Sequence, residues 1–112
     1  MRLPLVNLTP HEVTIFDADD KVVVRCPAAS KPVRVAVDRC EIGRIGGIPV
    51  FAEDYGKAPL LPEPALGVWY IVSSTVAVAH PERHDLLVPT DLVRSPDGTI
   101  LGCKALGRRN GS

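Results

Sequence analysis

This chain has few aromatic side chains and no excess of charge of either sign. Only 4% of its 112 residues are Phe, Trp or Tyr, and 13 basic side chains balance 13 acidic ones. Proteins that bind single-stranded nucleic acid stack bases on aromatic rings, and any broad grip on nucleic acid needs clustered positive charge. The composition therefore predicts neither broad nucleic-acid binding nor attachment to an anionic membrane.

The sequence also lacks long apolar runs and paired cysteines. No run approaches the ~18 apolar residues of a membrane helix, and the opening MRLP interrupts the chain before any apolar segment of the secretory-signal kind. Its cysteines, Cys26, Cys40 and Cys103, form no Cys-x-x-Cys pair, which favours reduced and mostly buried thiols. We therefore expect a cytoplasmic protein that is not bound to a membrane.

Motifs for catalysis, nucleotides or metals are missing as well. The glycines within 43–47 match neither the dinucleotide fingerprint nor a Walker loop, and the acidic turn 17–20 lacks the glycine of a calcium loop. His80 and His84 have the spacing of metal ligands on a helix, but Pro81 between them breaks a helix. These absences favour a non-enzymatic protein without a metal or other cofactor.

The richest structural signal lies in residues 67–93. The β-branched and aromatic residues of 68–72 are typical of a strand buried on both faces. Ser73, Ser74 or Thr75 is suited to cap one or two helical turns over 76–80, although continued strand is the alternative there. Residues 86–88 predict a second strand that ends at Pro89-Thr90-Asp91. The connection barely suffices for a parallel β-α-β unit, so antiparallel pairing is equally open.

Elsewhere the chain shows short apolar runs separated by turn residues. Strands are expected at 3–6, 13–16, 21–25 and 33–37, hairpins at 12–25, around 43–47 and at Pro96-Asp97-Gly98, and a proline-rich loop over 57–66. These elements predict a small β-rich α+β fold with hairpins and one or two short helices. A compact α/β fold with a partly parallel sheet is the alternative. We expect one globular domain over residues 1–106 and a flexible C-terminal tail over residues 107–112.

Polar side chains follow three of the expected strands and form the candidate site. They are Asn7, Thr9, His11, Ser73, Ser74, Thr90 and Asp91. If the strands are parallel neighbours, their carboxyl ends meet in one crevice, where open sheets bind ligands. These residues would then bind a small polar ligand, or arrange His11, Asp91 and a serine for acyl transfer. Helix caps and turns use the same residue types, so a purely structural role is the competing interpretation.

Three segments carry a resemblance to known proteins. The opening LVNLTPHEVTI, the GIPV at 47–50 and the DLLVPTDLVR at 85–94 resemble a group of small uncharacterised proteins of actinobacteria and their phages. The resemblance implies a bacterial or phage protein with an accessory or regulatory role. We therefore expect a non-enzymatic binding or interaction module with a protein partner or self-association. The alternative is a protein or enzyme that binds a small polar ligand at the strand-end corners.

Overall fold

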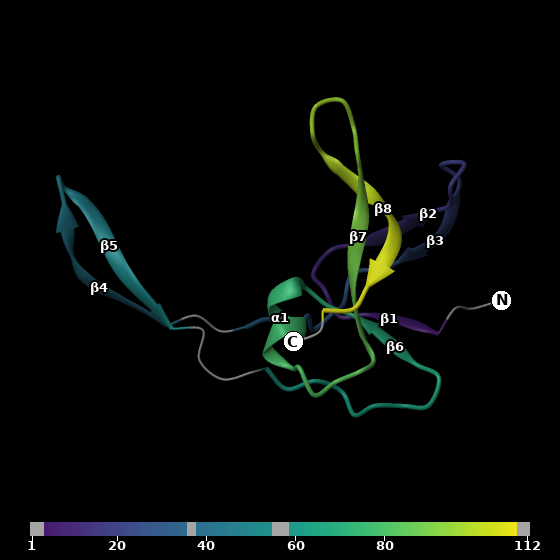
Figure 1. The fold of residues 1–112 in the computed structure, drawn as a ribbon, viewed down its shortest axis with the longest axis horizontal. Helices are drawn as coiled ribbons and strands as arrows, with labels where there is room; N and C mark the ends of the chain where they lie inside the picture. The colour runs from purple at the N-terminus through teal and green to yellow at the C-terminus, as the bar shows by residue number, and fades with distance from the viewer. Residues whose placement is uncertain (1–3, 36–37, 55–58, 110–112) are drawn as a thin grey trace.

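The computed structural model describes residues 4–35, 38–54 and 59–109, in which strands predominate. The strands are β1 (Leu5–Asn7), β2 (Val13–Phe16), β3 (Val22–Cys26), β4 (Asp38–Ile45), β5 (Ile48–Asp54), β6 (Trp69–Ile71), β7 (Leu86–Arg94) and β8 (Ile100–Gly107), and the helix is α1 (Ser74–Ala79). Six strands form one sheet in the order β1-β6-β7-β8-β2-β3, while β4 and β5 form a separate hairpin (Figure 1). The prediction of a small β-rich fold with hairpins and a short helix is confirmed.

Residues 69–94 form a parallel β-α-β unit. Tyr70 of β6 pairs with Leu86 of β7 in parallel register, and α1 lies between the two strands in sequence. Ser73 begins the helix, because its side chain accepts a hydrogen bond from the backbone N–H of Val76. Strand β1 also runs parallel to β6. The carboxyl ends of β1, β6 and the first part of β7 therefore face the same edge, as the crevice hypothesis requires.

The expected end of β7 at Pro89-Thr90-Asp91 is wrong. The strand continues to Arg94, with Pro89 opposite Leu106 and Thr90 opposite Ala105 of β8. Asp91 has a φ of 50°, although the register on either side of it counts residues one to one. The register shifts between Val93 and Arg94 instead, where Leu101 of β8 is the extra residue of a β-bulge. The pairing of β7 with β6 ends at Leu87. Pro89 has no backbone N–H, and at its position no hydrogen bond to β6 is lost as a result.

The strand expected over 33–37 is also absent where the structure describes that segment. Residues 32–35 have no strand pairing, and residues 36–37 lie outside the described part. The backbone N–H of Val33 donates to the carbonyl of Leu8 at 2.9 Å, and Val33 and Val35 pack against a buried cluster. Their alternating pattern therefore reflects a segment that covers the core rather than one that joins the sheet.

The sheet buries apolar side chains on both faces. One face, together with α1, packs the cluster Leu8, Tyr70, Val72, Val76, Ala77, Leu86 and Val88. The other face packs Val13, Cys26, Ile71 and Cys103. Tyr70 and Ile71 are neighbours in β6 that point to opposite faces, as the apolar run of this central strand predicts. The sheet also curls, so that its edge strands β1 and β3 come into contact.

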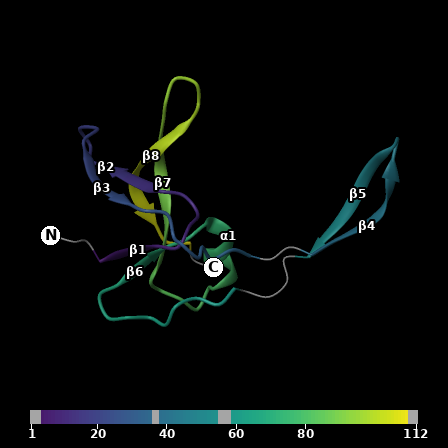
Figure 2. The ribbon, with the colours of Figure 1, turned by 180° about the vertical axis from the view of Figure 1, so that it is seen from behind.

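Strands β4 and β5 form a two-stranded arm that stands away from the sheet (Figures 1 and 2). Gly46 and Gly47 form its tip and both have positive φ values, which suits the tight turn of a two-residue hairpin. This confirms the hairpin expected around the glycines. The molecule is consequently elongated, with principal extents of 54 × 39 × 30 Å.

The hairpins expected at residues 12–25 and at Pro96-Asp97-Gly98 are confirmed, because β2 pairs antiparallel with β3 and β7 with β8. The expected tail begins within β8, whose last residue is Gly107, and residues 110–112 lie outside the described part. Among the described residues, no helix has the length and apolar character needed to span a lipid bilayer.

Candidate functional site

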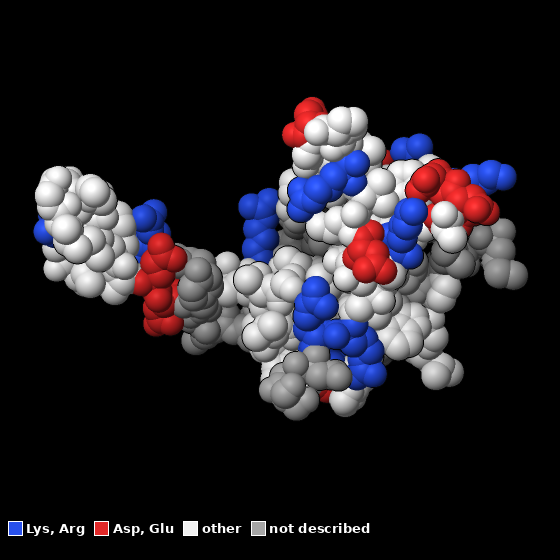
Figure 3. Space-filling view, turned by 45° about the horizontal axis from the view of Figure 1, so that its top comes forward, with Lys and Arg blue, Asp and Glu red and all other residues white. Residues whose placement is uncertain are grey.

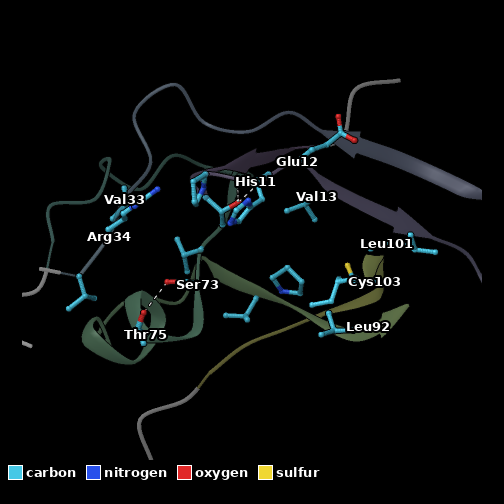
Figure 4. Close-up of a pocket in the computed structure, with 18 residues that line it drawn as sticks. His11, Glu12, Val13, Val33, Arg34, Ser73, Thr75, Leu92, Leu101 and Cys103 are labelled. Carbon is cyan, nitrogen blue, oxygen red and sulfur yellow. Dashed lines mark hydrogen bonds between the residues drawn. The ribbon is translucent and has the colours of Figure 1, made fainter. Parts of the chain in front are cut away.

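A cavity of about 670 Å³ opens where β1 and β6 end. Its walls come from the segments that follow β1 and β6, from β7 and β8, and from residues 33–35. In Figure 4, Ser73 and Thr75 lie on one side of the cavity, and Leu92, Leu101 and Cys103 lie on the other. The crevice predicted at the carboxyl ends of the parallel strands therefore coincides with a real hollow.

The structure brings some of the predicted site residues together. Thr9, His11 and Ser73 line the cavity. The remaining predicted residues, Asn7, Ser74, Thr90 and Asp91, are not among those that line it. Thr90 and Asp91 lie inside β7 rather than at its end. The described cavity thus contains a histidine and hydroxyl groups but does not combine His11 with Asp91.

Asn7 has a structural position. Its amide Nδ2 donates to the carbonyls of His11, Cys26 and Pro27 at 2.8, 3.2 and 3.0 Å. Its Oδ1 accepts from both the backbone N–H and the hydroxyl of Thr9, at 2.9 and 2.7 Å. The buried amide therefore has its donors and acceptor satisfied. Its hydrogen bonds hold the loop of residues 8–11, which contains His11, against the end of β1.

The two serines after β6 also have partners within the protein. The Oγ of Ser73 accepts from Val76 N and lies 3.1 Å from the hydroxyl of Thr75. The Oγ of Ser74 accepts from Nε of Arg109 at 3.1 Å. Ser73 therefore acts as a helix cap at the cavity wall, and Ser74 faces the C-terminal segment.

The cavity walls are mainly apolar, which the sequence-based hypothesis of a polar pocket missed. The apolar lining residues are Val13, Val33, Val35, Val72, Val88, Leu92, Ile100, Leu101 and Cys103, with Pro10 and Pro89. Ile100 and Leu101 remain 53% and 50% exposed, so the apolar surface extends onto the rim. The available signal is the adjacent apolar pair Ile100-Leu101 directly after the Pro-Asp-Gly turn, where the sequence predicts only the second strand of a hairpin.

The cysteine in the cavity wall is not poised as a nucleophile. Cys103 is fully buried, and its burial raises the pKa of the thiol above its ordinary value. Burial likewise raises the pKa of Cys26 on the same face of the sheet. Both groups are protonated thiols near neutral pH, because the thiolate is the form that burial disfavours. Cys103 therefore contributes apolar wall.

The two histidines of the connection 80–85 contact different parts of the chain. His80 Nε2 lies 2.6 Å from the carbonyl of Pro59, and its Nδ1 lies 2.9 Å from Glu82 Oε1. Arg108 lies 2.9 Å from His84 Nδ1. Within residues 4–35, 38–54 and 59–109, no cluster of three or more potential ligands suited to a metal occurs.

The arm provides a second candidate surface. Residues opposite each other in an antiparallel pair share a face, and successive residues alternate. Its register places one set of uncharged residues together, which we call the apolar face: Cys40, Gly43, Ile45, Ile48, Val50 and Ala52. Ile45 and Ile48 beside the tip are 71% and 67% exposed. In Figure 3 the outer part of the arm is largely uncharged, and acidic side chains lie at its base. The register places Asp38 and Asp54 there, at the end of the apolar face.

The opposite face of the arm carries charges that contact one another. Arg39 lies 3.7 Å from Glu53, and Arg44 lies 3.0 Å from Glu41. The guanidinium of Arg39 also sits 4.0 Å from the centre of the Phe51 ring. The arm is therefore amphipathic, although no described strand or helix outside it pairs with it.

Comparison with protein-family models, curated proteins and solved structures gives no significant match to this chain. The described residues form a small strand-rich fold with a mixed sheet, one helix and a projecting arm.

Proposed function

We propose that this protein is a non-enzymatic interaction module that self-associates through the arm. The observation that carries the proposal is the apolar face at residues 40–52, which is exposed along an otherwise unsupported hairpin. Isolated two-stranded hairpins are at best marginally stable in water, and exposed apolar patches commonly mark interaction sites. A partner that covers this face would stabilise the arm and the complex together.

The arm has little internal stabilisation of its own. Its ion pairs are solvent-exposed, and such pairs contribute little because water and salt screen them. Burial of Ile45 and Ile48 against a partner would each contribute roughly 1–2 kcal/mol. These two residues flank the tip and would therefore act as the anchors of the interface.

The self-association is tested by the mass of the particle in solution. Light scattering after size-exclusion chromatography, over a dilution series, is expected to give an oligomer that dissociates on dilution. The double variant Ile45→Ser/Ile48→Ser is expected to be monomeric with an unchanged circular-dichroism spectrum. Its matched control, Leu60→Ser/Leu66→Ser, removes two exposed leucines outside the arm and should associate normally.

Two outcomes would refute this function. The first is a full chain that stays monomeric at every concentration at which it remains dissolved. The second is a control variant that weakens association as much as the arm variant does. In the second case, general hydrophobic adhesion would explain the association without a specific role for the arm.

A second function is favoured by the cavity, whose volume lies in the ~300–1,000 Å³ range of small-molecule sites. Its walls suit an apolar body, while Thr9, His11 and Ser73 offer polar contacts. A native mass spectrum of the purified protein tests this function. Retained small molecule would appear as added mass that is lost on denaturation, and His11→Ala should reduce its occupancy.

A further inference from the structure

We infer that the arm of one copy docks its apolar face into the cavity of a second copy. This inference rests on the proposed self-association and specifies where the arm binds. Each copy has one arm and one cavity, so the contact joins two different surfaces. Such contacts close into rings or reciprocal pairs, or extend as chains, depending on the rotation between copies.

The size of the arm argues against stacking of two arms as the whole interface. At about 3.4 Å per residue and 4.8 Å between strands, the seven residues of β5 and their partners make a face of roughly 24 × 10 Å. This footprint of roughly 240 Å² is far below the ~800 Å² per partner of a stable interface. The arm therefore needs a partner surface that surrounds it on more than one side, as a cavity does.

The cavity and the arm match in chemistry. The tip places Ile45 and Ile48 side by side, and the cavity continues onto an exposed apolar rim at Ile100 and Leu101. Insertion of the tip would place these exposed apolar side chains of the arm against the apolar walls and rim of the cavity. Only Glu12 and Arg34 are charged among the residues that line the cavity.

A second hollow on the described surface is a poorer partner for the arm. Its volume is about 510 Å³, and it is lined in part by the consecutive polar residues Glu82, Arg83, His84 and Asp85. An apolar tip inserted there would remove water from charged groups without replacing their hydrogen bonds. The cavity beside β7 and β8 is therefore the docking site that we assign.

Complementation between two defective variants tests the inference. Ile45→Ser/Ile48→Ser damages the arm and keeps the cavity, whereas Leu101→Glu places a charge on the cavity rim and keeps the arm. Each variant alone should bind itself roughly 100-fold more weakly than the unmodified protein. The arm variant loses two apolar anchor residues, and Leu101→Glu would bury a charge in the interface. Mixed together, they should form a 1:1 heterodimer and nothing larger, because only one intact arm and one intact cavity remain. Val23→Glu, at a half-exposed position on β3, is the control for the added charge and should associate normally.

The outcomes separate the inference from the function on which it rests. If the arm variant is monomeric but Leu101→Glu associates like the unmodified protein, the arm mediates association and its docking into the cavity is refuted. If both variants associate normally, the proposed function itself is refuted. Two monomeric variants that fail to form a heterodimer, while both give folded circular-dichroism spectra, also overturn the inference.

A photocrosslinker attached to Cys40 supplies an independent readout. Cys40 lies on the apolar face and is exposed, so a benzophenone there should crosslink to residues of the cavity rim in a second copy. Peptides containing residues 99–103 are the expected products. Crosslinks between two arms, or a rapid Cys40–Cys40 disulfide under mild oxidation, would contradict docking into the cavity.

Discussion

The side-chain amide of Asn7 donates a hydrogen bond to the backbone carbonyl of Cys26 at 3.2 Å. Asn7 ends β1 and Cys26 ends β3, and these are the two edge strands of the six-stranded sheet. A single side chain therefore joins the edges of the curled sheet. The same amide holds the loop that presents His11 to the cavity.

Asn7→Asp is expected to destabilise the protein by about 2–3 kcal/mol at neutral pH, because a carboxylate oxygen at this buried position would face three backbone carbonyl oxygens. The folded state should raise the pKa of the new carboxyl. Stability lost at neutral pH should therefore be regained as the pH falls and the group protonates. Urea unfolding at several pH values measures this effect. Thr9→Ser retains the hydroxyl that donates to Asn7 and serves as the mild control; equal stability of both variants would show that the amide does not hold the corner.

Arg83→Met should cost about 2 kcal/mol near pH 7, because Arg83 makes two 2.8 Å hydrogen bonds to a carboxylate that is largely buried. The hydrogen bonds from Arg83 lower the pKa of Asp85 below its ordinary value of 3.8. The pair therefore stabilises the fold above the ordinary carboxylate pKa, and this contribution disappears as the pH falls through the lowered value. The difference between Arg83→Met and the parent should shrink in acid.

The exposed pair between Lys104 and Asp20 provides the comparison for that experiment, with N···O at 2.8 Å but side chains 38% and 73% exposed. Lys104→Met should change the midpoint of urea unfolding much less than Arg83→Met. A similar effect of the two substitutions would show that burial does not decide the strength of the ion pair.

Gly102→Ala should destabilise the protein by about 3 kcal/mol, because the added methyl group would collide with the backbone carbonyl of Thr14 and approach Phe16 to 2.7 Å. Gly107→Ala in the same strand is the matched control. Its methyl group would meet nothing closer than the Arg109 side chain at 3.4 Å, which has room to move. Thermal unfolding of both variants checks the difference, and equal melting temperatures would exclude a tight approach of β8 to β2.

A maleimide should modify a single cysteine in the native protein, diluted until it is monomeric, and three cysteines after denaturation. Cys40 is exposed on the arm, whereas Cys26 and Cys103 are buried and their burial raises the pKa of each thiol. Intact mass after timed labelling measures the number of adducts. Rapid modification of Cys103 in the native state would mean that the cavity wall opens to solvent.

The local chemistry of turns predicted much of the fold. Pro96-Asp97-Gly98 and Gly46-Gly47 predicted hairpins, and the apolar run at Val68–Val72 predicted a central strand. Ser73 predicted the start of the helix, and Pro81 predicted that the helix ends before it. These signals act over a few residues, so they are visible without knowledge of distant partners.

The errors occurred where distant partners decide the structure. Pro89 reads as the end of a strand, but β7 exchanges β6 for β8 at that point and continues. Val33 and Val35 have the alternation of a strand, although they cover a cluster instead. Three predicted site residues meet at the cavity because β1 and β6 are parallel, and their spacing in the chain of over 60 residues left that pairing open.

The arm lies in the connection between β3 and β6 and pairs only within itself. The cost of closing a loop rises by only about 0.6 kcal/mol for each doubling of its length. The six-stranded sheet should therefore fold with a short linker in place of the arm, and with longer or different hairpins in the same position. The six-stranded sheet is therefore a scaffold with a replaceable attachment, so the sequence of the arm can change without any change in the core of the sheet.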